Sequence, residues 1–177
     1  NWFLNILGKR EDGYHDIVSL MQCISLSDSL AMEGSSAVDV ITSADIPREE
    51  NLVYKAAIRM QERAGMASGA RITLRKEIPL AAGLGGGSSD AAATLKGLTQ
   101  LWDLDFTPGE LAGIGETLGS DVPFFFYGPA SVVEGRGEIV SPVEIRKSYP
   151  LLLVKPGISI SAAWAYAEYD KVSLSGE

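Results

Sequence analysis

The chain contains the stretch Pro79-Leu80-Ala81-Ala82-Gly83-Leu84-Gly85-Gly86-Gly87-Ser88-Ser89-Asp90-Ala91-Ala92-Ala93, in which four glycines precede an alanine-rich helix. Glycine has no side chain to keep a ligand at a distance, and it reaches positive φ without strain. Successive backbone N–H groups can therefore face one concavity, and the following helix adds its unpaired N–H groups and the positive end of its dipole. The pattern favours a loop that binds polyphosphate through backbone amides.

Two better-known phosphate loops do not fit this stretch. A Walker A loop ends in Gly-Lys-Ser/Thr, whereas here Gly87 is followed by Ser88 and the run contains no lysine. The dinucleotide fingerprint fails as well, because Ser88 stands where its third glycine belongs. A flexible Gly/Ser linker is the remaining alternative, but such linkers seldom lead into a well-formed helix start, so phosphate binding is the preferred interpretation.

Composition narrows the class of protein. The chain has 177 residues, 46% of them hydrophobic, which is enough for one domain or for one and part of another. With 15 Lys+Arg against 23 Asp+Glu the net charge is −8, which argues against a nucleic-acid partner. No apolar stretch reaches the length of a membrane span, and the first residues lack the features of a secretory signal. The lone Cys23 fits a buried hydrophobe in a reducing compartment, so we expect a cytoplasmic protein without a membrane partner.

Hydrophobic periodicity predicts an alternation of strands and helices. A helix over 52–64 is expected to end at Gly65, and Thr107-Pro108-Gly109-Glu110 has the spacing of a capping box that opens a helix running to Leu118. The helix after the glycine loop should bury Ala91, Leu95, Leu98 and Trp102. Strands are expected over 2–7, 16–32, 38–41, 71–75, 124–127, 131–134, 138–140 and 151–154.

Asp121 lies in Gly119-Ser120-Asp121-Val122-Pro123-Phe124-Phe125, between the end of an expected helix and an apolar run. A carboxylate beside apolar walls can orient a substrate hydroxyl and accept its proton during phosphoryl transfer. Aspartate in a loop is also common as a cap or Asx-turn residue. Spacing alone leaves both interpretations open.

The single histidine, His15, follows Tyr14 just after an expected turn. A tyrosine ring can stack on a base while a histidine forms an in-plane hydrogen bond. From composition alone, a packed strand residue is the commoner role for such a histidine, and Tyr166 is by default a core aromatic.

The run 79–92 resembles the nucleotide loop of the GHMP kinases, which phosphorylate small molecules such as galactose, homoserine and mevalonate. Two further segments, Asp12-Gly13-Tyr14-His15 and Gly119 to Phe125, resemble the branch of that family that acts on a cytidine diphosphate derivative in isoprenoid biosynthesis. The resemblance implies an α+β fold of two domains. The N-terminal one, 1–149, would be similar to domain 2 of ribosomal protein S5, and 150–177 would begin a ferredoxin-like C-terminal domain.

The resemblance also implies roles for individual residues. Asp121 would be the catalytic base, Asn51 would contact the adenine nucleoside, and Asn1 would lie beside the transferred phosphate or the substrate hydroxyl. Cytosine would be held by Tyr14 and His15, with Tyr166 stacked on its other face. ATP would be bound, together with Mg²⁺, by Pro79, Ala81, Ala82, Gly83, Leu84, Gly85, Gly86, Gly87, Ser88 and Ser89. The family's catalytic lysine would stand two residues before Asn1, outside this sequence.

Two alternatives remain open at this point. One is another GHMP kinase, acting on an uncharged polyol or a mevalonate derivative, and it would not respond to CMP. The other is a non-catalytic RNA-binding module of the S5 type, which would bind RNA tightly and in a salt-sensitive manner.

Overall fold

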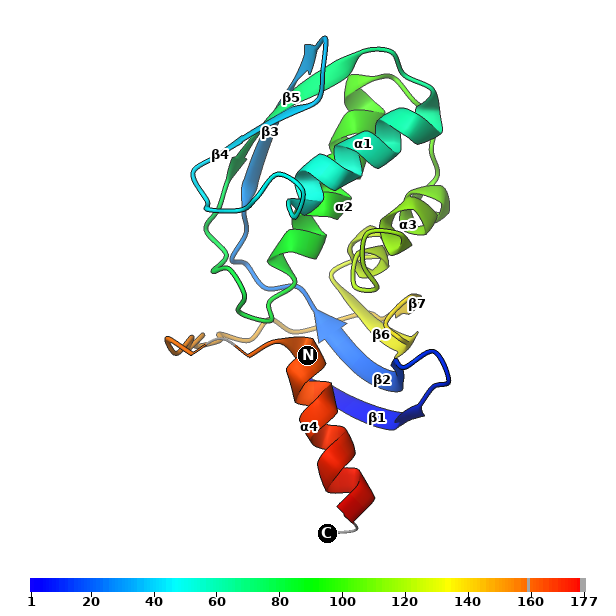
Figure 1. Ribbon diagram of the computed structural model, residues 1–177, viewed down its shortest axis with the longest axis vertical. Helices are drawn as coiled ribbons and strands as arrows, with labels where there is room; N and C mark the ends of the chain where they lie inside the picture. The colour runs from blue at the N-terminus through cyan, green and yellow to red at the C-terminus, as the bar shows by residue number, and fades with distance from the viewer. Residues whose placement is uncertain (159, 176–177) are drawn as a thin grey trace.

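The structure is a computed structural model that describes residues 1–158 and 160–175. Four strands come first along these residues, and helices, further strands and one short 3₁₀ helix, η1, follow them (Figure 1). Their order is β1 (Phe3–Lys9), β2 (His15–Gln22), β3 (Ser29–Ser35), β4 (Asp39–Thr42), α1 (Leu52–Ala64), β5 (Gly69–Arg75), α2 (Gly86–Leu101), α3 (Pro108–Glu116), η1 (Pro123–Phe126), β6 (Ala130–Gly135), β7 (Ile139–Pro142) and α4 (Ala162–Ser175).

The strands form two sheets. One is antiparallel with the order β1-β2-β6-β7, and the other has the order β3-β5-β4. In the second sheet β3 is antiparallel to β5, whereas β4 runs parallel to it. Parallel neighbours need a crossover connection, and α1 provides it between β4 and β5. The result is the mixed α+β architecture that the sequence predicts.

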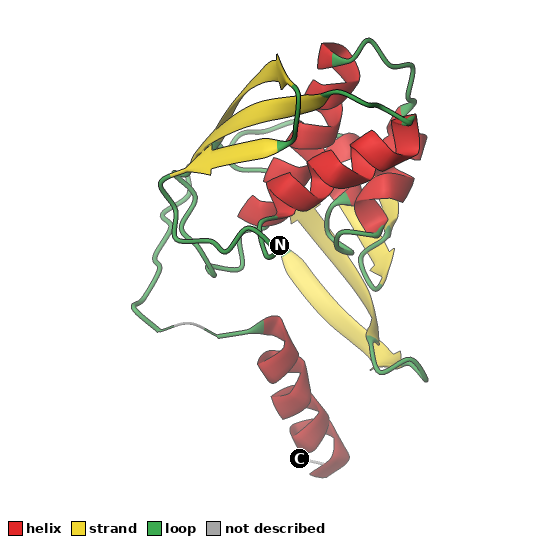
Figure 2. Ribbon diagram, turned by 45° about the horizontal axis from the view of Figure 1, so that its top comes forward, coloured by secondary structure: helices red, strands yellow, loops and turns green. Residues whose placement is uncertain are grey.

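Helices α1, α2 and α3 lie between the two sheets, and α4 extends away from them (Figures 1 and 2). Small residues on α1 and α2 let these two helices pack closely, and β5 covers them with alternate side chains, as the burial pattern of that strand shows. The main hydrophobic core consists of buried side chains from these elements and their neighbours, among them Val53, Ala57, Met60, Ile72, Leu95, Leu98, Leu111 and Val122.

The predicted helix ends at Gly65 and at Thr107–Glu110 are present, and Asn51 adds a cap that was not predicted from the sequence. The helix α1 begins after Asn51, whose side chain accepts a hydrogen bond from the backbone N–H of Val53, and ends at Gly65 with φ of 63°. The capping box of Thr107 and Glu110 is present at the start of α3. Helix α3 itself ends at Glu116, two residues before the predicted Leu118, and turn hydrogen bonds continue it to Gly119.

Three predicted strands are wrong in whole or in part. The run 16–32 is two strands in different sheets, because the chain leaves its ladder between Cys23 and Asp28. Residues 124–127 form η1 instead, since Pro123 fixes the first helical φ and the N–H groups of Phe125 and Tyr127 bond to carbonyls three residues earlier.

The third wrong strand is Leu151–Val154. These residues have no strand partner in the described part of the chain and are exposed, Leu152 to 91%. Without a neighbouring strand to pair its backbone groups, an apolar run does not form a strand. The domain division at residue 149 stays a prediction. Within the ranges 1–158 and 160–175, no helix has the length and apolar character needed to cross a membrane.

Candidate active site

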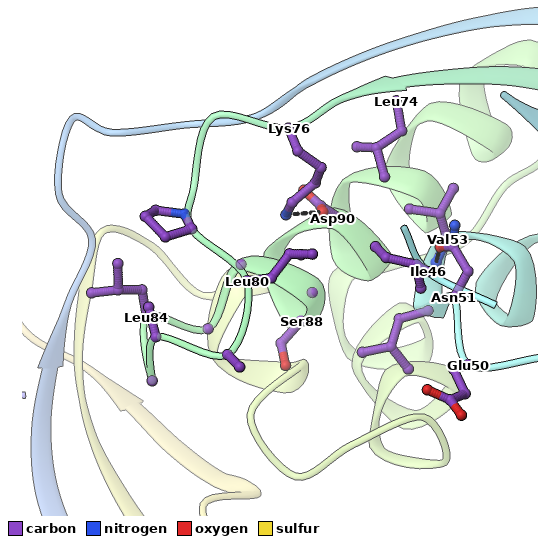
Figure 3. A pocket seen from close by; sticks show the side chains of 18 residues that line it. Ile46, Glu50, Asn51, Val53, Leu74, Lys76, Leu80, Leu84, Ser88 and Asp90 are labelled. Carbon is purple, nitrogen blue, oxygen red and sulfur yellow. Dashed lines mark hydrogen bonds and ion pairs between the residues drawn. The ribbon is translucent and has the colours of Figure 1, made fainter. Parts of the chain in front are cut away.

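The glycine loop lines a cleft of about 350 Å³ together with the N-terminus of α1 (Figure 3). Of the residues predicted to bind ATP, Asn51 and all of the loop residues from Pro79 to Ser88 named above line this cleft. Ser89 does not. Its hydroxyl donates a hydrogen bond to the carbonyl of Gly86 at 2.8 Å, so it closes the first turn of α2 instead.

The loop backbone has the alternating form of an anion-binding turn. Positive φ angles occur at every second residue, Ala81 (51°), Gly83 (67°) and Gly85 (66°). Gly85 is the N-cap of α2, and no side chain caps the helix there. The first N–H groups of α2 therefore have no side-chain acceptor, and they carry the positive end of the helix dipole. An anion in the cleft would fill that position.

The helix α2 begins earlier than the sequence predicts, because Gly86 and Gly87 form its first turn. A Cβ atom at Gly86 would lie 2.9 Å from the side chain of Ile78, and one at Gly87 would lie 3.2 Å from that of Leu52. Packing at the start of the helix thus disfavours a side chain at Gly86, and a side chain at Gly87 would require the end of Leu52 to move. Gly83 and Gly85 serve the turn.

An ion-pair cluster that the sequence did not reveal fixes the start of the loop. The Lys76 ammonium donates to the carboxylate of Asp90 at 2.8 Å and also pairs with Asp28. The second oxygen of Asp28 accepts hydrogen bonds from the backbone N–H groups of Glu77 (2.6 Å) and Ile78 (2.8 Å). Figure 3 shows Lys76 and Asp90 at the edge of the cleft. These three nearly buried charged side chains thus connect the end of β5, the start of α2 and the β2–β3 connection.

Burial and hydrogen-bonded or charged partners shift the pKa values of these three groups in opposite directions. Burial disfavours the charged form of Lys76, but its two carboxylate partners outweigh this and raise its pKa. Burial also raises the pKa of Asp90, to about 6, and Lys76 offsets this only in part. Burial acts in the same direction on Asp28, but the bonds from Lys76, Ile78 and Glu77 outweigh it and lower the pKa of that carboxyl.

Asp121 lies in the connection between α3 and η1, beside the hairpin of β6 and β7. A Cβ atom at Gly137 would lie 3.3 Å from Asp121 Oδ1, so the missing side chain of this glycine leaves room for the carboxylate. Asp121 is exposed as a residue, but the protein around its carboxyl group desolvates it in part and raises its pKa. Among the described residues, no group donates a hydrogen bond to this carboxylate and no cation pairs with it. Its proton affinity suits a general base more than an ion-pair partner.

Packing connects the Asp121 segment to the glycine loop. The ring of Phe125 in η1 comes within 3.3 Å of the position that a Cβ atom would take on Gly85. The carbonyl of the same residue accepts a hydrogen bond from Lys96 on α2 at 2.5 Å. The element that follows Asp121 thus rests against the N-terminal half of α2.

Of the three residues predicted to hold a base, the structure brings two together. The rings of His15 and Tyr166 are stacked, with centroids 4.8 Å apart and planes inclined by 15°. Tyr14 is 55% exposed. The guanidinium of Arg136 lies over the Tyr14 ring, 5.0 Å from its centroid. The charge of Asp121 contributes to the raised pKa of Tyr166, after the larger effect of burial, which places these two residues near each other.

Asn1 is exposed and stands just before β1. In the part of the chain that the structure describes, no three His, Cys, Asp or Glu side chains form a group able to hold a metal ion.

The site residues that sequence reasoning missed are Asp28, Lys76, Asp90, Arg136 and Asp170. A polar residue directly after a strand that feeds a glycine loop was a usable signal for Lys76, but no local pattern pointed to Asp28 or Asp170.

Comparison with known proteins agrees with this geometry. The family model "GHMP kinases N terminal domain" matches residues 51–129, which run from the α1 cap through the glycine loop to the end of η1. A protein of Thermodesulfovibrio yellowstonii named 4-diphosphocytidyl-2-C-methyl-D-erythritol kinase is 53% identical over 100% of this chain and 62% of its own length. One of Alkaliphilus metalliredigens with the same name is 42% identical over 98% of this chain and 61% of its own. The chain thus spans about three-fifths of the length of these curated relatives.

Solved structures place the fold in the same family. A crystal structure of 4-(cytidine 5'-diphospho)-2C-methyl-D-erythritol kinase is 41% identical, with a TM-score of 0.69 over 81% of this chain and 52% of that one. The homoserine kinase of Cytophaga hutchinsonii shares the fold at 22% identity, with a TM-score of 0.51 over 90% of this chain and 56% of its own. The fold, the family model and the similarity along the whole chain agree: residues 51–129 of this chain form an N-terminal domain of the GHMP kinase family.

Proposed function

We propose that this protein transfers the γ-phosphoryl group of ATP to the 2-hydroxyl of 4-diphosphocytidyl-2-C-methyl-D-erythritol, in the non-mevalonate pathway to isoprenoid precursors. The observation that carries the proposal is the carboxylate of Asp121, which has a raised pKa and no partner among the described residues. It lies just before η1, which packs on the glycine loop, and its charge acts on Tyr166, which stacks on His15. The names of the relatives supply the substrate.

The cleft at the glycine loop is the proposed ATP site. Backbone amides at the start of α2 would hold the phosphates, and Ser88 and Asn51 line the same cleft. The side-chain oxygen of Asn51 is used by the helix cap, which leaves its amide nitrogen to donate to the nucleoside. Because the described residues offer no carboxylate cluster, Mg²⁺ would arrive bound to the ATP phosphates, whose charge it neutralises.

Asp121 supplies the proton acceptor in this proposal. Its carboxylate takes the proton of the substrate hydroxyl as the hydroxyl oxygen bonds to the γ-phosphorus. The bond from that phosphorus to the oxygen bridging to the β-phosphate breaks, and ADP leaves with the electron pair. The amides of the loop stabilise the charge on the phosphoryl oxygens.

In this proposal the cytidine end of the substrate lies at the aromatic group, which consists of Tyr14, His15 and Tyr166. Tyr14 and Tyr166 offer ring faces for stacking, and His15 offers a ring nitrogen for an in-plane hydrogen bond. Asn1 would lie at the substrate hydroxyl or the transferred phosphate. Both ligands are small molecules of the cytoplasm, where we place the enzyme.

The test is the variant Asp121→Asn, compared with Asp105→Asn, an exposed aspartate in the loop before α3. Asparagine keeps the shape of the side chain but accepts no proton. We expect turnover to fall by about 100-fold or more while the affinity for ATP is retained, and we expect Asp105→Asn to match the unmodified protein. Unchanged turnover in Asp121→Asn would remove this residue from the chemistry.

A further inference from the structure

Asp170 on α4 connects two residues that lie far from it in the sequence. One of its oxygens lies 2.6 Å from Nε2 of His15, and the other accepts a hydrogen bond from Lys9 Nζ at 2.6 Å. The histidine side chain is 6% exposed and that of Asp170 is 19% exposed, so water competes only weakly for the contact between them.

The charge state of Asp170 decides which nitrogen of His15 carries hydrogen. Hydrogen bonds from Lys9 and then from His15 lower the pKa of Asp170, so its carboxyl stays ionised and only accepts hydrogen bonds. Nε2 of His15 must then be the donor. In a neutral imidazole with hydrogen on Nε2, Nδ1 carries the free lone pair and is an acceptor.

Nδ1 of His15 is available to a ligand. It has no hydrogen-bond partner among the described residues, and it is not one of the two buried side-chain atoms without a partner, which are Trp102 Nε1 and Ser131 Oγ. It therefore keeps contact with solvent. Tyr166 stacks on the ring, and Tyr169 meets it edge-on with centroids 6.3 Å apart. Residues of α4 thus fix both the plane of the imidazole and its pattern of donor and acceptor.

We propose that Asp170 is a positioning residue that makes His15 a hydrogen-bond acceptor at Nδ1, so that the site selects a pyrimidine with an exocyclic amino group over one with a carbonyl. The inference rests on the proposed function, which places the cytosine ring of the substrate at His15. The 4-amino group of cytosine donates hydrogen bonds, whereas uracil carries an acceptor oxygen at the same position. An acceptor nitrogen fixed opposite that oxygen would leave both groups unpaired, which disfavours uracil.

The first experiment reads the protonation pattern directly. His15 is the only histidine of the chain, so a ¹⁵N-labelled protein gives one imidazole pattern. At about pH 8, we expect hydrogen on Nε2 and an unprotonated Nδ1. Hydrogen on Nδ1, alone or together with Nε2, would overturn the proposal.

The second experiment measures base selectivity, with calorimetric titrations of CMP and UMP into the unmodified protein and into Asp170→Asn. An asparagine can accept from Nε2 or donate to it, so both tautomers of His15 become accessible. We expect the unmodified protein to prefer CMP, and the ratio of CMP to UMP affinity to fall by about tenfold in the variant. A merely structural role of Asp170 would weaken both nucleotides alike and leave the ratio unchanged, and that result would overturn the proposal.

Two further variants serve as controls for this experiment. Asp170→Glu restores a carboxylate and should recover most of the selectivity, and failure of this rescue would count against a role of the carboxylate. Glu168→Gln removes a half-exposed acid on the same helix, whose carboxylate pairs with Lys171, and should keep the ratio. If CMP binds with equal selectivity to all variants, the role of Asp170 fails while the proposed function stands. If neither nucleotide binds the unmodified protein, the proposed substrate site fails and this inference fails with it.

Discussion

Three aspartates of this chain have the same carboxyl group, and their surroundings give them different proton affinities. Asp28 is held ionised by one ammonium and two backbone N–H groups. Asp90 shares that ammonium but lies in a more desolvating position, and its pKa rises to about 6. Asp121 is an exposed residue with neither partner, and desolvation of its carboxyl group by the protein around it raises its pKa. Only the last is arranged to take up a proton from a substrate, because the other two are committed to Lys76.

The raised pKa of Asp121 predicts the pH dependence of the reaction. The base acts only when ionised, so kcat/KM should fall as the pH drops through a pKa above 3.8, the ordinary value for aspartate. The measurement is a pH–rate profile, with tryptophan fluorescence recorded at each pH to show that the protein stays folded. A profile that is flat down to about pH 4 would contradict a raised pKa at the base.

Asp90 predicts a pH dependence of stability instead. Its carboxyl has a pKa of about 6 in the folded protein against 3.8 in a model compound, so between these values the folded chain binds more protons than the unfolded one. Stability is therefore lost as the pH rises through this window. The free energy of unfolding of the unmodified protein should fall by about 3 kcal/mol relative to Asp90→Asn between about pH 4 and about pH 7. Urea unfolding at several pH values measures this difference, and parallel curves for the two proteins would refute it.

At the scale of elements, the glycine loop and the start of α2 act as one unit. Gly85 has φ of 66° and faces the ring of Phe125, so alanine there meets both backbone strain and a close contact. We expect Gly85→Ala to lower stability by about 1–2 kcal/mol and to weaken ATP binding, because the strained cap turns the first amides of α2 away from the phosphates.

The matched control is Gly113→Ala in α3. A Cβ atom at Gly113 would meet nothing within 4 Å, so this substitution should stabilise the helix by about 0.5–1 kcal/mol. ATP affinity should stay the same. Thermal unfolding with and without ATP separates the two effects, and equal ATP affinity in both variants would contradict the role given to Gly85.

The elements that sequence reasoning located correctly are those specified by local chemistry. Asn51, Gly65 and the Thr107–Glu110 box each fix a helix end through their own hydrogen bonds or φ angle. The errors fall where the structure depends on pairing partners that are distant in sequence. Residues 16–32 alternate as one strand, yet their two halves pair with different sheets, and Leu151–Val154 is apolar but has no partner strand. The Lys76 cluster was missed for the same reason, since its acids come from positions 28 and 90.

At the scale of the whole molecule, the two proposed ligand sites use different parts of the fold. The ATP cleft lies at the glycine loop and the N-terminal ends of α1 and α2, whereas the group at His15 depends on α4, which extends away from the two sheets (Figure 2). Helix α4 contacts the four-stranded sheet through Lys9 of β1 and His15 of β2. A helix held by a few side chains opens more readily than one in a core.

This difference predicts how each ligand changes hydrogen exchange. A non-hydrolysable ATP analogue should slow exchange of the amides in 79–90, because these donate to the phosphates or lie in the turn that follows. CMP should slow exchange in 12–16 and in 162–170, since a bound base joins Tyr14 and His15 to Tyr166 and so holds α4 against the sheet. Helix α3, whose residues Leu111 and Ala112 are buried in the main core, serves as the internal reference that neither ligand changes. Protection of 79–90 by CMP, with none in α4, would show that the base binds at the loop and not at the aromatic group.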